Sequence, residues 1–168
     1  MNTIPTTPLL PPHFPVQKAR EGIAAWDRQA VEARLDYIDR MLGFLREQAN
    51  QSQQALQEDP RSYHAALYEL QSSLQAVVDI AAQVVDALGQ EQPQERGDAL
   101  GILAKAGIVP SSLAEALVPA LSLRETLMRE YVHVAPDVVY QFLQENLDDL
   151  ERFCWRILDY MDRSEQAS

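Results

Sequence analysis

Apolar side chains recur every three or four residues along most of this chain, and this spacing constrains its fold more than any other feature. Intervals of three and four place side chains on one face of an α-helix, whereas a strand would need strict alternation. A first run follows Asp27 and consists of Val31, Leu35, Ile38, Leu42, Leu45 and Ala49. A second run follows Asp59-Pro60 and stops before Gly89; it consists of Leu67, Leu70, Leu74, Val77, Ala81, Val84 and Leu88. Because Asp caps a helix start, Pro suits its first position and Gly ends it, the sequence predicts two long amphipathic helices.

The segments between the long helices are predicted to be connections and one short helix. The Gln-rich stretch 48–57 either frays the first helix or forms the connection to the second, and 90–97 is a polar connection. A short helix is expected from Asp98 to Ala106, ending at Gly107. These segments leave room for one short helix between the longer ones.

The second half of the chain predicts two more long helices. Ser112 and Glu115 have capping-box spacing for a helix that Pro119 should break or kink. Ala135-Pro136-Asp137 opens the last helix, whose apolar stripe consists of Val139, Leu143, Leu147, Leu150, Phe153, Ile157 and Met161. We find no segment of strand period and no internal repeat. The predicted fold is all-α: an up-and-down bundle of four main helices plus a short one.

Composition limits the function and the domain organisation. A chain of 168 residues with 46% apolar residues suits one folded domain, expected over 27–163, with a proline-rich arm over 1–26 and a polar tail over 164–168. The arm is either disordered or lies on the body or on a partner. The net charge of −11 opposes sequence-independent binding of nucleic acid, so any contact with RNA would be weak and confined to a local pocket.

The single cysteine, Cys154, excludes an internal disulfide and fits a reducing cytoplasm. We expect no signal peptide and no membrane-spanning helix. No His, Cys and Asp residues have the spacing of metal ligands and no Gly-rich phosphate loop occurs, so neither a metal nor a cofactor is expected.

The stretch from Leu123 to Tyr131 carries the polar residues of greatest chemical interest. On a regular helix Arg124 and Tyr131 share a face, while Arg129 lies about 140° further round. A guanidinium binds phosphate or carboxylate and a phenol donates, accepts and stacks, so the stretch could meet a phosphate or a base. Alternatively, both arginines extend over the helix surface or pair with nearby carboxylates.

Four segments together resemble the HepT-like branch of the HEPN superfamily. They are 74–81 (LQAVVDIA), 103–110 (LAKAGIVP), 124–131 (RETLMREY) and 147–153 (LDDLERF), and the resemblance covers roughly 27–163. The resemblance implies a small helical bundle that pairs as a homodimer. It also implies a metal-independent ribonuclease toxin whose partner is a minimal nucleotidyltransferase that acts as antitoxin.

The signature of that family is Arg, four to six residues, His, any residue, Tyr. Here Arg124 and Tyr131 match, but Arg129 stands where the histidine should be. The acidic residue usual in the second helix falls on Gln75, the aspartate four residues later is present as Asp79, and the residue usually Asn is Glu125. The resemblance further implies that the antitoxin can transfer nucleotidyl groups onto Tyr131. Asp79 lies in an apolar part of its helix, which is costly for a carboxylate unless it is paired or faces a cleft.

Replacing the signature histidine by arginine changes the expected chemistry. Metal-free cleavage of RNA requires a group that takes a proton from the 2′-hydroxyl, and histidine suits that step because its pKa lies near neutrality. Arginine stays charged, so Arg129 can still bind phosphate together with Arg124 but cannot act as a base. Of the three histidines, His13 is in the arm, His64 begins a long helix, and His133 either swings into the site or is an ordinary turn residue.

Three functions therefore remain. The first is the toxin-type component of a toxin–antitoxin module that is weak or inactive as a ribonuclease and acts by binding a nucleotide or a partner. The second is an active metal-independent RNA endoribonuclease in which Arg129 or His133 substitutes for the missing histidine. The third is a helical adaptor without a nucleotide role, which the net charge of −11 favours.

Overall fold

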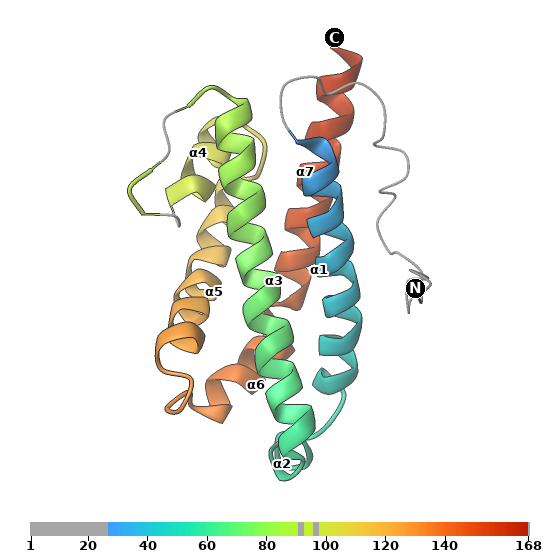
Figure 1. Ribbon diagram of the computed structural model, residues 1–168, viewed down its shortest axis with the longest axis vertical. Helices are drawn as coiled ribbons and strands as arrows, with labels where there is room; N and C mark the ends of the chain where they lie inside the picture. The colour runs from blue at the N-terminus through green and yellow to red at the C-terminus, as the bar shows by residue number, and fades with distance from the viewer. Residues whose placement is uncertain (1–26, 91–92, 96–97, 168) are drawn as a thin grey trace, which may run out of the picture.

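A computed structural model describes residues 27–90, 93–95 and 98–167, and every regular element within them is a helix. Four helices are long: α1 (Arg28–Ala49), α3 (Pro60–Ala87), α5 (Ser111–Arg129) and α7 (Leu147–Gln166). Three are short: α2 (Gln53–Glu58), α4 (Ala99–Lys105) and α6 (Pro136–Glu145). The four long helices alternate in direction, as the colour order in Figure 1 shows. The predicted all-α up-and-down bundle is confirmed, while the expected arm over 1–26 lies outside the described residues.

Local capping explains where the first two long helices begin. The Asp27 side chain accepts a hydrogen bond from the Ala30 backbone N–H at 3.1 Å, and Asp59 accepts one from the Arg61 N–H at 3.1 Å, with Pro60 at the first helical position. Gly89 follows α3 with a φ of 66°, a conformation that costs glycine little. These starts and this end match the sequence expectations.

The connection between α1 and α3 and the start of α5 both differ from expectation. Part of the Gln-rich stretch forms a separate helix, α2, which Ser52 caps through its hydroxyl. The predicted capping box of Ser112 and Glu115 is wrong, because α5 already begins at Ser111. Its N-cap residue is Pro110, whose side chain makes no capping hydrogen bond. Pro119 lies inside α5, which continues through it to Arg129, so of the predicted break or kink the break does not occur.

The expected last helix is two helices that meet at Asn146. Asn146, with φ −118° and ψ −3°, is the C-cap of α6 and donates its N–H to the Phe142 carbonyl at 2.9 Å. In Figure 1, α6 crosses the lower end of the bundle, whereas α7 runs up its length. One straight helix could not pack in both directions, so the chain breaks although the apolar stripe is continuous in sequence. The helix α7 extends to Gln166, into the segment expected as a polar tail.

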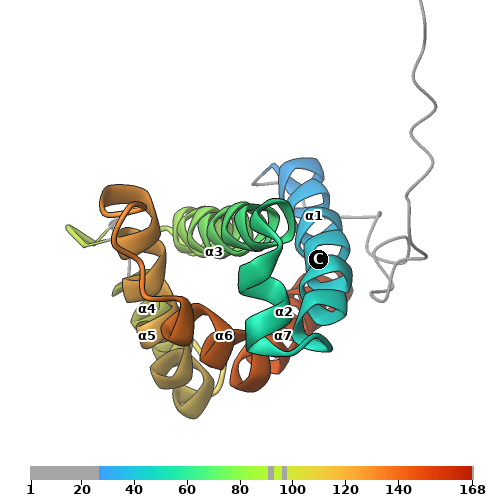
Figure 2. The same cartoon turned by 90° about the horizontal axis from the view of Figure 1, so that it is seen from below.

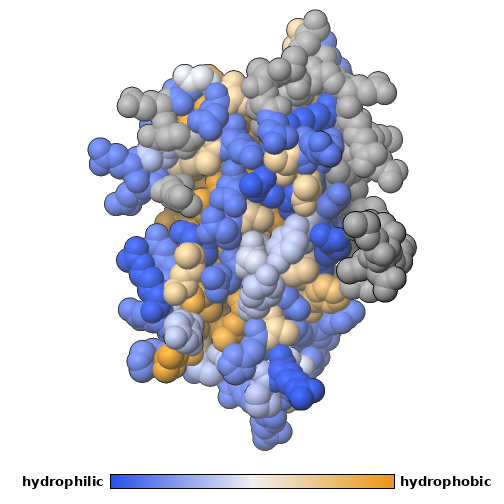
Figure 3. Space-filling view, in the orientation of Figure 1, coloured by the Kyte–Doolittle hydropathy of each residue, from blue (hydrophilic) through white to orange (hydrophobic). Residues whose placement is uncertain are grey.

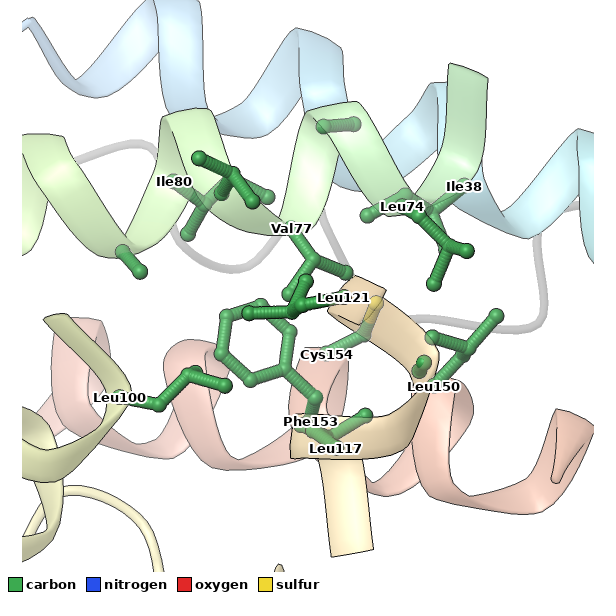
Figure 4. Close-up of a cluster of buried hydrophobic side chains, with 14 of the residues drawn as sticks. Ile38, Leu74, Val77, Ile80, Leu100, Leu117, Leu121, Leu150, Phe153 and Cys154 are labelled. Carbon is green, nitrogen blue, oxygen red and sulfur yellow. The ribbon is translucent and has the colours of Figure 1, made fainter. Parts of the chain in front are cut away.

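A single core joins the long helices. Figure 4 shows side chains from α1, α3, α4, α5 and α7 converging on Phe153 of α7, and its labelled members Ile38, Leu74, Val77, Ile80, Leu100, Leu117, Leu121, Leu150 and Cys154 are all buried. Every residue of the three predicted apolar stripes except Ala49, Leu67 and Leu88 is fully buried. In the view along the bundle, α3 lies between α1 and α5 (Figure 2). The order α1, α3, α5 therefore leaves α3 with one outward face, flanked by both neighbours.

An ion-pair cluster ties α7 to α1 at the edge of this core. Arg46 donates to the Glu151 carboxylate at 2.5 Å and to that of Asp148 at 3.2 Å. These hydrogen bonds raise the pKa of the Arg46 guanidinium against the opposing effect of its partial burial. Burial, with Asp39 and Glu151 nearby, raises the pKa of the Cys154 thiol well above its usual value, so this cysteine is an unreactive core residue. Within the described ranges no helix is long and apolar enough to cross a membrane.

Candidate functional site

A groove of about 660 Å³ runs along α5 and is bordered by α3, the start of α4 and the segment before it. Its described lining combines two arginines and three carboxylates with apolar and neutral polar groups: Val78, Gln94, Glu95, Asp98, Val118, Leu121, Ser122, Arg124, Glu125 and Arg129. Its volume is in the range of small-molecule binding sites. Both predicted phosphate-binding arginines therefore line one cavity.

Arg124 is the most enclosed charged group in the groove. The residue is only 8% exposed, and its Nη1 donates to Gln75 Oε1 at 2.7 Å across the α3–α5 interface. Its Nη2 lies 3.8 Å from the Glu125 carboxylate, whose side chain is 59% exposed, and its buried Nε has no hydrogen-bond partner. Because Arg124 also lines the groove, its guanidinium is placed to bind an anion that enters there.

Gln75 and Asp79 form a polar chain that fixes Arg124 in place. Gln75 Nε2 donates to Asp79 Oδ1 at 2.9 Å, so the amide accepts from the arginine on one side and donates to the carboxylate on the other. Arg34 of α1 lies 3.7 Å from Asp79 Oδ2, and the Asp79 side chain is 36% exposed. The Asp79 carboxylate is thus paired and partly solvated, as its position in an apolar helix required. Sequence reasoning missed Arg34, because nothing in its own stretch of α1 indicates a partner 45 residues away.

Arg129 reaches the same groove although it is 140° round the helix from Arg124 by regular geometry. It is the last residue of α5 and is exposed, so its long side chain is free to turn toward the groove. The two arginines therefore line one groove although they lie on different sides of the helix.

Tyr131 does not share a helix face with Arg124, contrary to expectation. The helix ends at Arg129, and the residues after it form a turn in which the His133 N–H donates to the Glu130 carbonyl at 2.7 Å. Helix propensity is low along Tyr131-Val132-His133-Val134, and Pro136 then starts α6, so α5 cannot continue. Tyr131 is 72% exposed, and neither it nor His133 is among the residues that line the groove.

No histidine lines the groove in the part of the chain that the structure describes. His64 is exposed in the first turn of α3, with Nδ1 2.7 Å from the Pro60 carbonyl oxygen, and His13 lies outside the described residues. The groove therefore provides groups that bind anions, but among its described lining residues the histidine of the family signature is absent. Glu95 and Asp98 also line it; sequence reasoning placed them in a connection and at a helix start and did not connect them with the arginines.

The fold and the groove define a helical bundle with a buried arginine at the interface between α3 and α5. The family model described as "Ribonuclease HepT-like" matches residues 34–157, and the chain belongs to this family. A protein of Archaeoglobus fulgidus named "Putative RNase" is 27% identical over 106 residues, which cover 63% of this chain and 80% of that protein.

Solved structures of similar fold include a tri-AMPylated HEPN toxin of Shewanella oneidensis in complex with MNT antitoxin. It is 22% identical, with a TM-score of 0.69, and the match covers 76% of this chain and 96% of the toxin. The cytosolic protein of unknown function YutE from Bacillus subtilis is 18% identical with a TM-score of 0.75, over 84% of this chain and 95% of YutE. At these identities the likeness concerns the fold.

Proposed function

We propose that this protein is the toxin-type component of a toxin–antitoxin pair in the cytoplasm, and that it acts by binding with weak or no ribonuclease activity. The observation that carries the proposal is the groove itself: buried Arg124 and exposed Arg129 line it, and no described histidine does. Cations at this site bind a phosphate and stabilise its charge, whereas cleavage also requires a proton acceptor. We therefore expect anion binding to be retained and proton transfer, without the signature histidine, to be weak or lost.

The proposed macromolecular partner is a minimal nucleotidyltransferase that acts as antitoxin. Support comes from the family to which the chain belongs and from the Shewanella oneidensis toxin of similar fold, which was solved in complex with MNT antitoxin. Tyr131 is the proposed site of modification, because its hydroxyl stands on an exposed turn where a second enzyme can reach it. A nucleotidyl group on Tyr131 would add negative charge two residues after Arg129.

The outward face of α3 supports a homodimer. Tyr68 on α3 and Met128 and Val132 at the end of α5 are exposed by 67%, 49% and 72%. Figure 3 shows apolar side chains along the seam between α5 and α3 on this side of the molecule. Between α1 and α3, the hydroxyl of Tyr37 donates to the Ser72 hydroxyl at 2.7 Å. Exposed aromatic and Met side chains with few charges are typical of the centre of an interface.

Light scattering at micromolar concentration should give the mass of a dimer, and Tyr68→Arg should shift it toward the monomer. Trp155→Arg, on α7, introduces the same charge at another exposed aromatic residue and should leave the dimer intact. A monomeric wild-type protein would contradict this part of the proposal.

The central test is binding of a phosphate group without cleavage. AMP should bind the wild-type protein, Arg129→Gln should weaken binding, and a generic single-stranded RNA should stay intact in the presence of EDTA. Absence of AMP binding by a folded, dimeric protein would favour the adaptor function. Robust metal-free cleavage would instead establish the active endoribonuclease.

A further inference from the structure

The groove is electrically asymmetric along α5. Arg129 and Arg124 line one part of it, and Val118 marks the other end, eleven residues before Arg129 and therefore about 16 Å away along the helix. Asp98 lies at the Val118 end, because these two residues also line a neighbouring hollow of about 430 Å³ together with Ala114 and Glu115. In Figure 1, α4, which begins next to Asp98, packs beside the first half of α5.

A second carboxylate lies close to Asp98. The Asp98 N–H donates to the Glu95 carbonyl at 3.0 Å, and both side chains are exposed and line the groove. The described part of the groove thus has a cationic end on α5 and an acidic end before α4. Between them lie exposed Val118, the Ser122 hydroxyl and the edge of buried Leu121.

The cationic end has the capacity for one phosphate. Arg124 is held by the neutral amide of Gln75, and the carboxylate at 3.8 Å belongs to Glu125, whose exposed side chain makes only a weak pair. Arg124 therefore keeps most of its charge, and Arg129 adds a second, solvent-exposed guanidinium. Two guanidinium groups match a terminal phosphate with two negative charges.

We infer that this groove takes a mononucleotide or the 5′-phosphorylated end of a nucleic acid, and that it excludes a continuous strand. The inference rests on the proposed anion binding and specifies its ligand. A stacked strand places a phosphate about every 3.4 Å, so a strand along a groove of about 16 Å would bring phosphates against Glu95 and Asp98. A single nucleotide places its phosphate at the arginines and its sugar and base over Val118 and Ser122.

The test compares two short single-stranded oligonucleotides that differ only in a 5′-phosphate or a 5′-hydroxyl. Both carry 2′-O-methyl groups, which remove the nucleophile for cleavage, and a 3′ fluorophore for anisotropy. We expect the 5′-phosphorylated probe to bind, the 5′-hydroxyl probe to bind at least tenfold more weakly, and AMP to displace the bound probe. The logarithm of affinity should fall with the logarithm of salt concentration with a slope near −0.7, the value for one phosphate on a single strand.

A charge-matched pair of variants tests the role of the acidic end. Glu95→Gln with Asp98→Asn should raise the affinity of the 5′-hydroxyl probe by about fivefold at low salt, because two exposed repulsions are removed. It should leave AMP binding within twofold. Glu58→Gln with Glu145→Gln makes the same change in net charge on exposed residues of α2 and α6 and should change neither affinity by more than twofold.

The outcomes separate this inference from the function on which it rests. If AMP binds but both oligonucleotides bind equally, with a slope of several phosphates, the groove accepts a continuous strand and the inference is wrong while anion binding stands. If neither AMP nor the phosphorylated probe binds the folded protein, the proposed anion binding itself fails.

Discussion

Replacing Arg129 by histidine tests whether a missing proton acceptor is what separates this groove from a working ribonuclease site. Arg129 lines the groove together with Arg124, and an arginine side chain carries hydrogen-bond donors but no acceptor. A histidine with a pKa near 6.5 exists in both protonation states close to neutrality. The substitution therefore supplies the group that the signature of the family contains and this chain lacks.

The size of the effect follows from the position of Arg129 in the structure. Because Arg129 is exposed at the end of α5, its replacement should change the free energy of unfolding by no more than about 0.5 kcal/mol. A positioned acid or base typically accelerates a reaction by about 10²–10⁴-fold. We expect the lower end, about 10²-fold or about 2.7 kcal/mol of transition-state free energy, because Gln75 and Glu125 also depart from the family pattern.

The assay is cleavage of a 5′-labelled single-stranded RNA in EDTA, followed between about pH 5.5 and 8.5. Arg129→His should produce 2′,3′-cyclic phosphate ends, and its rate should vary with pH around the imidazole pKa. Arg129→Gln is the matched control, since it removes the same charge and adds no titrating group. Its rate should remain at the wild-type level or below across this range.

One result would refute the reasoning. If folded Arg129→His still binds AMP yet cleaves no faster than Arg129→Gln, the absent histidine is not what limits the site. Strong cleavage by the wild-type protein that disappears in His133→Ala would refute it from the other side, because the working base would then be on the turn after α5.

Three further predictions concern modification, the polar chain and the core. A nucleotidyltransferase that modifies this protein with ATP should label Tyr131, which is 72% exposed, so Tyr131→Phe should abolish the mass increase while Tyr68→Phe leaves it unchanged. Gln75→Glu should weaken AMP binding by about fivefold in a titration, because a carboxylate in place of the amide would pair with the Arg124 guanidinium and offset its positive charge. Unchanged or tighter binding would show that the neutral Gln75 amide is not what leaves the Arg124 charge available to the ligand. Phe153→Ala should lower the free energy of unfolding, measured in urea, by about 3–5 kcal/mol, because the side chain is fully buried where α1, α3, α4, α5 and α7 meet. A loss below about 1 kcal/mol would contradict a single core shared by these helices.

Expectations based on periodicity and capping succeeded for α1 and α3, where the cause is local, although the local capping box expected at Ser112 did not form. The spacing of apolar residues identified α1 and α3, and the starts at Asp27 and Asp59-Pro60 follow from side chains that cap their own helices. The same method failed at Asn146, where a continuous apolar stripe hides a change of direction between α6 and α7. Direction depends on what each helix packs against, and no local pattern records that.

The residues of the candidate site also fall into those that the sequence indicated and those that only the structure brought together. The family signature identified Arg124, Arg129 and Tyr131 by their order, but it did not reveal that α5 ends before Tyr131. Nor did it indicate that Gln75 accepts a hydrogen bond from Arg124, 49 residues further along the chain. The acidic residues Glu95 and Asp98 have no motif and enter the groove only because the chain folds back against α5.

The sequence by itself determined that this protein is a helical bundle, which faces of its helices are buried, and that its signature lacks a histidine. Those properties follow from the chemistry of neighbouring residues, since a helix forms and hides one face through interactions three and four residues apart. Only the tertiary structure decided which charges meet: that Arg124 is buried against Gln75, that Arg129 turns into the same groove, and that two carboxylates close its other end. Electrostatic interactions depend on distance in space, and that distance is set by the packing of helices remote from one another in sequence.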